Sequence, residues 1–205
     1  MPEKFEQKEV VNEKEARWKE VEAEVEQIGD KLGKGIDDGI KPAVKGLMAN
    51  GFKTTMSCEG HLDHGFPWPN IDIASPLEEA IENNPRYPEL EERVEKYSAT
   101  SEEGEEYRKM RELILESRSK EVDKLKATLG DFYADGGGQP ESIVVNEFGD
   151  VEPKEISELR NRIKGEILDV HKNWPKEEKK KNLEIYQKEF QRFAEFLKER
   201  FFSGK

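Results

Sequence analysis

The stretch from residue 50 to residue 64, N-G-F-K-T-T-M-S-C-E-G-H-L-D-H, decides how this chain folds. Asn50-Gly51 is a helix stop, because Asn and Gly adopt the left-handed conformation after a helix with little strain. Residues 52–57 follow at once and are rich in β-branched and aromatic side chains, which predicts a short strand. That strand delivers Cys58 to its exit, where Gly60 and Gly65 let the backbone turn and approach a ligand closely.

A second strand is expected directly after this loop, over residues 70–74. The preceding F-P-W-P segment holds the chain extended, and the next residues, N-I-D-I-A, alternate polar and apolar side chains. Ile71 and Ile73 then face one side of the sheet, and Asn70 and Asp72 face the other. We expect this strand to pair with the first one across the loop.

Amphipathic helices precede the two strands. Apolar residues from Trp18 to Leu32 recur at spacings of three and four, which places them on one stripe of a helix. Three glycines between residues 29 and 35 interrupt the pattern, and a second helix resumes it from Ile36 to Met48. Asp37 and Asp38 are expected in the first turn of this second helix, where acidic side chains suit the helix dipole.

The whole chain, 1–205, is predicted to be a single α+β domain: a small sheet of about three or more strands packed against long amphipathic helices. An N-terminal helix (1–34) precedes the helix-strand-loop-strand unit (35–75). An acidic helical insertion, 76–103, follows the second strand. Residues 104–205 then supply a long helix, a glycine-rich connector at 136–138, a strand at 142–145 and two C-terminal helices.

Composition limits the classes of function. Hydrophobic residues make up 34% of the chain and charged residues 39%, and the formal net charge is −12. Non-specific nucleic-acid binding needs clustered Lys and Arg and is therefore disfavoured. No stretch reaches the ~20 apolar residues that span a bilayer, and the N-terminal residues lack the apolar core of a signal peptide. With a single cysteine, the chain is expected to reside in the cytoplasm.

The loop after the first strand is the candidate site. Cys58, His61 and His64 form C-x2-H-x2-H and account for three of the four Cys and His residues of the chain. A thiolate with two imidazoles suits a divalent metal, most of all zinc, and three protein ligands leave a fourth position for water or substrate. Glu59, Asp63 and Asp72 are candidates for a further ligand, a partner of an imidazole or a general base.

Two other interpretations of the same loop stay open at the sequence level. In a metal-free site, His61 activates the Cys58 thiol, and Asp63 or Asp72 orients the imidazole. In a purely structural loop, Cys58 is a small buried hydrophobe and the histidines bond to backbone. His171, far along the chain, is interpreted as a solvated or capping residue.

The helix from Ile40 to Gly51 and the following T-T-M-S-C-E-G-H resemble an uncharacterised bacterial family with the motif G-F-x-T-x-x-S-C-E-G-H. More distantly, the segment is similar to the wybutosine-synthesis tRNA methyltransferases, whose motif ends in S-S-C-S-G-R at the same kind of strand exit. That resemblance covers about twenty residues and implies that Ser57, Cys58 and Gly60 line a site. His61 stands where that family has an arginine, which removes a fixed positive charge.

The sequence thus predicts a Cys/His metal site in an enzyme or an enzyme-like protein that binds a small molecule. Cys58, Glu59 and Asp72 are the candidate catalytic residues, and Ser57, Gly60 and Asp63 are the candidate binding residues. Whether the chain catalyses a reaction stays open. Two alternatives remain: an interaction protein whose helices bind a protein partner or a second copy, and a protein related to RNA modification.

Overall fold

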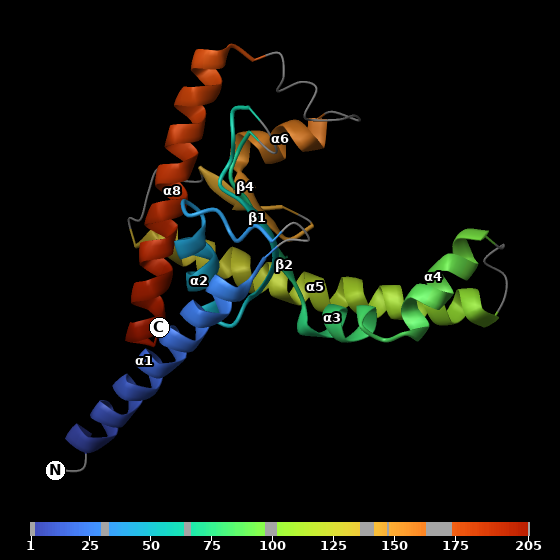
Figure 1. Cartoon of the computed structure of the whole chain (residues 1–205), viewed down its shortest axis with the longest axis horizontal. Helices are drawn as coiled ribbons and strands as arrows, with labels where there is room; N and C mark the ends of the chain where they lie inside the picture. The colour runs from blue at the N-terminus through green and yellow to red at the C-terminus, as the bar shows by residue number, and fades with distance from the viewer. Residues whose placement is uncertain are drawn as a thin grey trace.

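The computed structural model describes residues 3–29, 33–63, 67–96, 102–135, 142–146, 148–162 and 174–204. Within these ranges an antiparallel sheet of four strands lies at the centre of the molecule, in the order β1-β2-β4-β3 (Figure 1). The strands are β1 (Lys53–Cys58), β2 (Asn70–Ala74), β3 (Ile143–Val145) and β4 (Asp150–Pro153). The α+β fold class and the pairing of the first two strands are confirmed.

Helices of 7 to 33 residues pack against this sheet or extend from it (Figure 1). They are α1 (Glu3–Gln27), α2 (Lys41–Ala49), α3 (Pro76–Glu82), α4 (Arg86–Lys96), α5 (Glu102–Ala134), α6 (Lys154–Arg162) and α8 (Lys176–Ser203). Helices α3 and α4 pack along the first part of α5, and together they project as an arm from the sheet (Figure 1). Among the described residues, no helix is long and apolar enough to cross a membrane.

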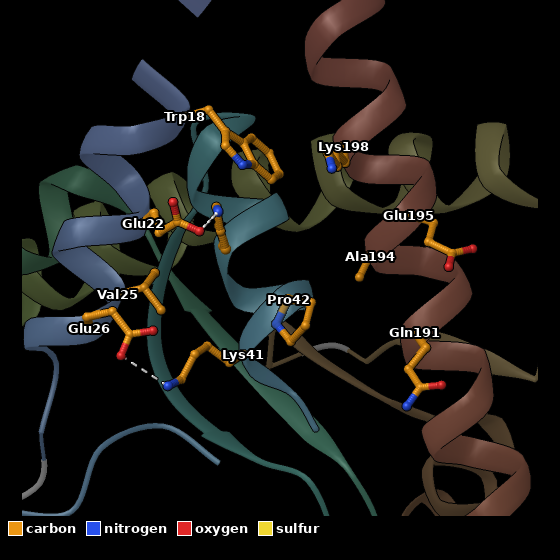
Figure 2. Close-up of a pocket in the computed structure, with 11 residues that line it drawn as sticks. Trp18, Glu22, Val25, Glu26, Lys41, Pro42, Gln191, Ala194, Glu195 and Lys198 are labelled. Carbon is orange, nitrogen blue, oxygen red and sulfur yellow. Dashed lines mark hydrogen bonds and ion pairs between the residues drawn. The ribbon is translucent and has the colours of Figure 1, made fainter. Parts of the chain in front are cut away.

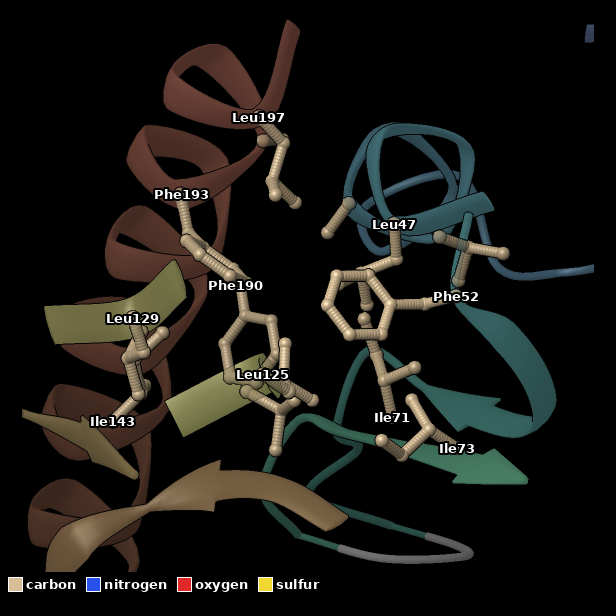
Figure 3. Close-up of a cluster of buried hydrophobic side chains, with 14 of the residues drawn as sticks. Leu47, Phe52, Ile71, Ile73, Leu125, Leu129, Ile143, Phe190, Phe193 and Leu197 are labelled. Carbon is tan, nitrogen blue, oxygen red and sulfur yellow. The ribbon is translucent and has the colours of Figure 1, made fainter. Parts of the chain in front are cut away.

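One face of the sheet carries the hydrophobic core. Ile71 and Ile73 of β2 are buried against side chains from α2, α5 and α8, which converge on this face in Figure 3. Leu47 from α2, Leu125 from α5 and Phe193 from α8 are all fully buried there. The apolar stripes of these helices therefore cover the face of the sheet that carries Ile71 and Ile73, the apolar residues of the alternating pattern in β2.

The opposite face of the sheet is polar. The register pairs Cys58 with Asn70, Met56 with Asp72, and Asp72 with Asp150, so these side chains share a face. We call this surface the polar face and define it by Met56, Cys58, Asn70, Asp72, Asp150 and Glu152. The predicted division of β2 into an Ile71/Ile73 side and an Asn70/Asp72 side is confirmed.

The structure departs from the predicted elements in two places. Strand β4 was not predicted, because D-V-E-P offers a single large apolar residue and places its acidic residues on the polar face. Asp37 and Asp38 precede α2 instead of forming its first turn, since the helix begins at Lys41 and Asp37 accepts the Ile40 and Lys41 N–H groups through its carbonyl. The predicted connector at 136–138, the helix beyond residue 162 and His171 lie outside the described residues.

Candidate metal centre

The exit of β1 meets the segment that leads into α2. Cys58 is the last residue of β1, His61 follows three residues later, and Asp37 lies just before the α2 start. One potential ligand atom from each of these residues lies within 4.8 Å of the other two. All three residues are half-buried, with 19% of the His61 side chain and 35% of the Asp37 side chain exposed. Two segments some twenty residues apart thus place a thiol, an imidazole and a carboxylate together.

Gly60 makes the turn between Cys58 and His61. Its φ of 84° lies in the left-handed region that favours glycine. A Cβ at this position would lie 2.8 Å from the Trp68 carbonyl carbon and 2.6 Å from Leu183 Cδ1. Gly60 therefore packs against the backbone just before β2 and against α8, with no room for a side chain, and this close packing fixes the direction of the loop.

Hydrogen bonds hold the three candidate ligands in place. Asp37 Oδ2 accepts the Glu59 N–H at 3.2 Å and lies 3.2 Å from His61 Nε2. The Gly60 N–H donates to Cys58 Sγ at 3.4 Å. A donor of this kind favours negative charge on its acceptor, so the turn supports a thiolate at Cys58 when one forms.

Glu59 ties this loop to two helices. Its Oε2 accepts the Gly39 N–H at 2.7 Å, and its carbonyl oxygen accepts a hydrogen bond from Gln187 Nε2 of α8 at 3.0 Å. A Cβ at Gly39 would lie 2.4 Å from Glu59 Oε2, so the glycine leaves space for that carboxylate. The Glu59 side chain is thus a link between the loop and the start of α2, and its predicted role as a base stays a prediction.

The donor set fits zinc. A tetrahedral zinc ion with bonds of about 2.0–2.3 Å holds its ligand atoms about 3.3–3.8 Å apart. The Asp37 and His61 atoms already stand 3.2 Å apart, and the whole group spans at most 4.8 Å. Binding a zinc ion therefore requires the three ligands to shift by only about 1 Å.

The remaining predicted residues lie at different places. Ser57 pairs with Ile71 and so points to the core side of β1, where it lines a cavity of about 180 Å³ along the outer edge of that strand. Asp63 is exposed in the loop, and Asp72 lies on the polar face, two residues along β2 from Asn70. His64 and Gly65 lie outside the described residues.

Asp72 has an altered acidity. Burial and the neighbouring Asp150, with which it shares a hydrogen bond across strands, raise the pKa of Asp72 to about 7. Asn70 Nδ2, which donates to Asp72 Oδ1 at 3.3 Å, opposes the shift in pKa, as does the positive charge of Arg118. The carboxyl group that the sequence offered as a base thus titrates near neutral pH, where a group can both accept and return a proton.

Asp37 is the candidate ligand that the sequence argument missed. Its predicted place in the first turn of a helix suggested a role in the helix dipole, and twenty residues separate it from Cys58. The D-D-G pattern at 37–39 carried a signal nonetheless, since Gly39 marks a close backbone approach to something outside the helix. What it approaches is Glu59.

A separate cavity lies away from the Asp37–Cys58–His61 cluster. A cavity of about 600 Å³ opens between α1, α2 and α8 (Figure 2). Its wall contains Trp18 and Val25 of α1 and Ala194 of α8. Beside it, ion pairs join α1 to α2: Lys41 with Glu26, which Figure 2 shows, and Lys45 with Glu22. This cavity is distinct from the Cys58 loop in both position and chemistry.

Comparison with known proteins gave no match at any of three levels: protein-family models, curated proteins and solved structures. The function must therefore be argued from the residues of the site.

Proposed function

We propose that this chain binds a divalent metal ion, zinc in preference to others, through Asp37, Cys58 and His61, and that the centre serves an enzyme or an enzyme-like protein that binds a small molecule. The observation that carries the proposal is the meeting of three different ligand types within 4.8 Å at one strand exit. Thiolate, imidazole and carboxylate together form a donor set that zinc accepts readily.

Three protein ligands leave one tetrahedral position for water or a substrate atom, which is the arrangement of catalytic zinc sites. Zinc bound there would supply an activated water near neutral pH or polarise a carbonyl group. The protein's own contribution is placement: Asp37 holds both the His61 imidazole and the Glu59 N–H, and Gly60 brings its N–H to Cys58. The half-buried ligands leave an approach from solvent.

Asp72 supports the enzymatic version of the proposal. It lies on the same face of the sheet as Cys58, two residues along β2 from Asn70, the strand partner of Cys58. Two residues of a strand span roughly 7 Å. Its pKa of about 7 suits a group that takes up a proton and returns it. We assign Asp72, with Asp150, as the proton acceptor of the site. Hydrolysis or hydration of a small polar molecule is the reaction class that these groups fit best.

Metal analysis of untagged protein tests the proposal. We expect about one zinc per chain in the wild type. The affinity for zinc should fall by 10-fold or more in the Asp37→Asn, Cys58→Ser and His61→Ala variants. Asp38→Asn is the matched control, because the side chain of Asp38 is 99% exposed and adjoins Asp37. His64→Ala asks whether the remaining histidine of the motif is a ligand. Wild-type protein without bound metal after reconstitution with zinc would refute the proposal, as would unchanged binding in the three ligand variants.

A second candidate is an interaction protein. The cavity between α1, α2 and α8 favours it, because Trp18 lines the cavity with Lys45 Nζ 4.6 Å from its ring centre. Sizing at several concentrations tests association with a second copy. The resemblance to tRNA-modifying methyltransferases stays an expectation, and the net charge of −12 argues against an extended RNA surface.

A further inference from the structure

The polar face carries a group of side-chain oxygen atoms beside the candidate metal centre. Asp72 of β2 and Asp150 of β4 are direct partners in the sheet, and their carboxyl groups interact through a hydrogen bond. Asn146 Nδ2 donates to Asp150 Oδ2 at 2.8 Å and to Glu152 Oε1 at 2.8 Å, and Arg160 of α6 pairs with Glu152 at 2.8 Å. Glu152 is therefore neutralised by Arg160, whereas Asp72 and Asp150 face each other.

Asn70 adds an independent observation. Only 6% of this residue is exposed, and its Oδ1 has no hydrogen-bond partner within the described part of the chain. A buried side-chain oxygen that lacks a donor calls for an explanation, and a bound water or ion is one that fits beside two carboxylates. The same amide donates from Nδ2 to Asp72 Oδ1 at 3.3 Å, so the group lies against the acid pair.

We propose that Asp72, Asp150 and the Asn70 side-chain oxygen form a second cation site, which takes a hard divalent ion such as Mg²⁺ or Mn²⁺. Carboxylate and amide oxygens are the ligands that such ions prefer, and sulfur is absent from this set. A cation bound there takes the place of the proton on Asp72, so Asp72 acts as the proton acceptor of the first centre only while the second site is empty. The same cation satisfies Asn70 Oδ1. Water molecules complete the octahedral shell, as they usually do for Mg²⁺.

The site adjoins the proposed zinc centre, because Asn70 is the direct strand partner of Cys58. The two sites differ in donor chemistry, however, and the inference does not depend on zinc binding. A soft ion selects Cys58 and His61, and a hard ion selects the three oxygen ligands. Each site can therefore be removed without the ligands of the other.

Mn²⁺ is the probe, added to the full chain at pH 8 after treatment with a chelator and followed by electron paramagnetic resonance. We expect one Mn²⁺ per chain in the wild type and in a Cys58→Ser, His61→Ala double variant. Affinity should fall by at least 10-fold in Asp72→Asn and in Asp150→Asn. Asn70→Asp should bind Mn²⁺ more tightly than the wild type, because it offers a charged oxygen in place of the amide.

The outcomes separate the two proposals. Mn²⁺ binding that survives in the double variant and fails in Asp72→Asn supports the second site, whatever the zinc result. No binding at millimolar Mn²⁺, or binding that the aspartate variants leave unchanged, overturns it. Asn70→Asp provides a readout that a misfolded variant cannot mimic, because unfolding cannot increase the affinity for Mn²⁺. Weaker Mn²⁺ binding in a folded Asn70→Asp protein would contradict the role of Oδ1.

Discussion

The two polar clusters beside β2 are built in different ways. The Asp37–Cys58–His61 cluster is held by a turn, with Gly60 fitted against backbone and Glu59 bonded to the α2 start. The Asp72–Asp150 pair is set by strand register alone, since each residue stands opposite the other in the sheet. The first cluster therefore depends on local backbone contacts. The second depends on the protonation and mutual repulsion of two carboxyl groups, Asp72 and Asp150, whose positions the sheet already fixes.

Gly60→Ala should have the largest effect, because it attacks the turn that builds the first cluster. The substitution adds a Cβ that would meet the Trp68 carbonyl carbon at 2.8 Å, at a φ of 84° that alanine adopts with strain. We expect a loss of about 2–4 kcal/mol in the free energy of unfolding, measured by urea denaturation, together with loss of metal binding at Cys58.

Two other glycines separate the causes of that loss. Gly51 has a φ of 83° but open space around it, so Gly51→Ala should show the strain alone, about 1 kcal/mol. Gly130 lies within α5 with no atom near its Cβ position, and Gly130→Ala should stabilise the helix by up to about 1 kcal/mol. If Gly60→Ala costs no more than Gly51→Ala, the close packing of the turn is not what holds the loop.

The same difference explains how much of the molecule the sequence could predict. The helix stop at Asn50-Gly51, strand β1 and the alternation in β2 are local signals, and the structure confirms all three. Cys58 and His61 were named because they are rare residues close together in the chain. Local patterns were enough wherever the chemistry comes from one short segment.

Long-range partners escaped prediction. Asp37 joins Cys58 through a contact between segments, and Asp150 reaches Asp72 through β4, which has almost no apolar periodicity. Asp72 was named as a base, but neither the burial that raises its pKa nor the second cause, the neighbouring Asp150 carboxyl group, could be identified without the fold and the strand register. Pairings of this kind depend on how the whole core closes, and no pattern within a single segment records that.

The acid pair predicts a pH dependence of intermediate size. Asp72 has a pKa of about 7 in the folded protein and an ordinary pKa of 3.8, so the folded state binds more protons between these values. The contribution of Asp72 to stability is fully present below about pH 4 and is lost as the pH rises through about 7. Because the carboxyl group is partly exposed, we expect a loss on the order of 1–2 kcal/mol in chelator-containing buffer.

Asp72→Asn isolates that contribution from the titration of all other groups. The difference in unfolding free energy between wild type and variant, followed from pH 4 to pH 8, should move in favour of the variant as the pH rises. Millimolar Mn²⁺ should reduce the loss at pH 8 in the wild type, because the cation then offsets the repulsion between Asp72 and Asp150. Parallel stability curves for the two proteins would show that the pKa of Asp72 is not raised in the folded state.

The last prediction, similar in size to that for Asp72, concerns Glu59 and asks whether its carboxylate positions the loop. Glu59→Ala removes the acceptor of the Gly39 N–H and should cost about 1–2 kcal/mol, whereas Glu59→Gln keeps an oxygen there and should cost under about 1 kcal/mol. Glu26→Gln, an exposed change in the ion pair with Lys41, is the control and should change stability by at most about 0.5 kcal/mol. Asp37 still accepts the Glu59 N–H in both variants. Because Glu59→Gln also keeps an acceptor for the Gly39 N–H, zinc affinity should change little in that variant and more in Glu59→Ala. If Glu59→Ala and Glu59→Gln instead lose zinc affinity equally and strongly, without any loss of stability, the Glu59 carboxylate is itself a zinc ligand and does not merely position the loop.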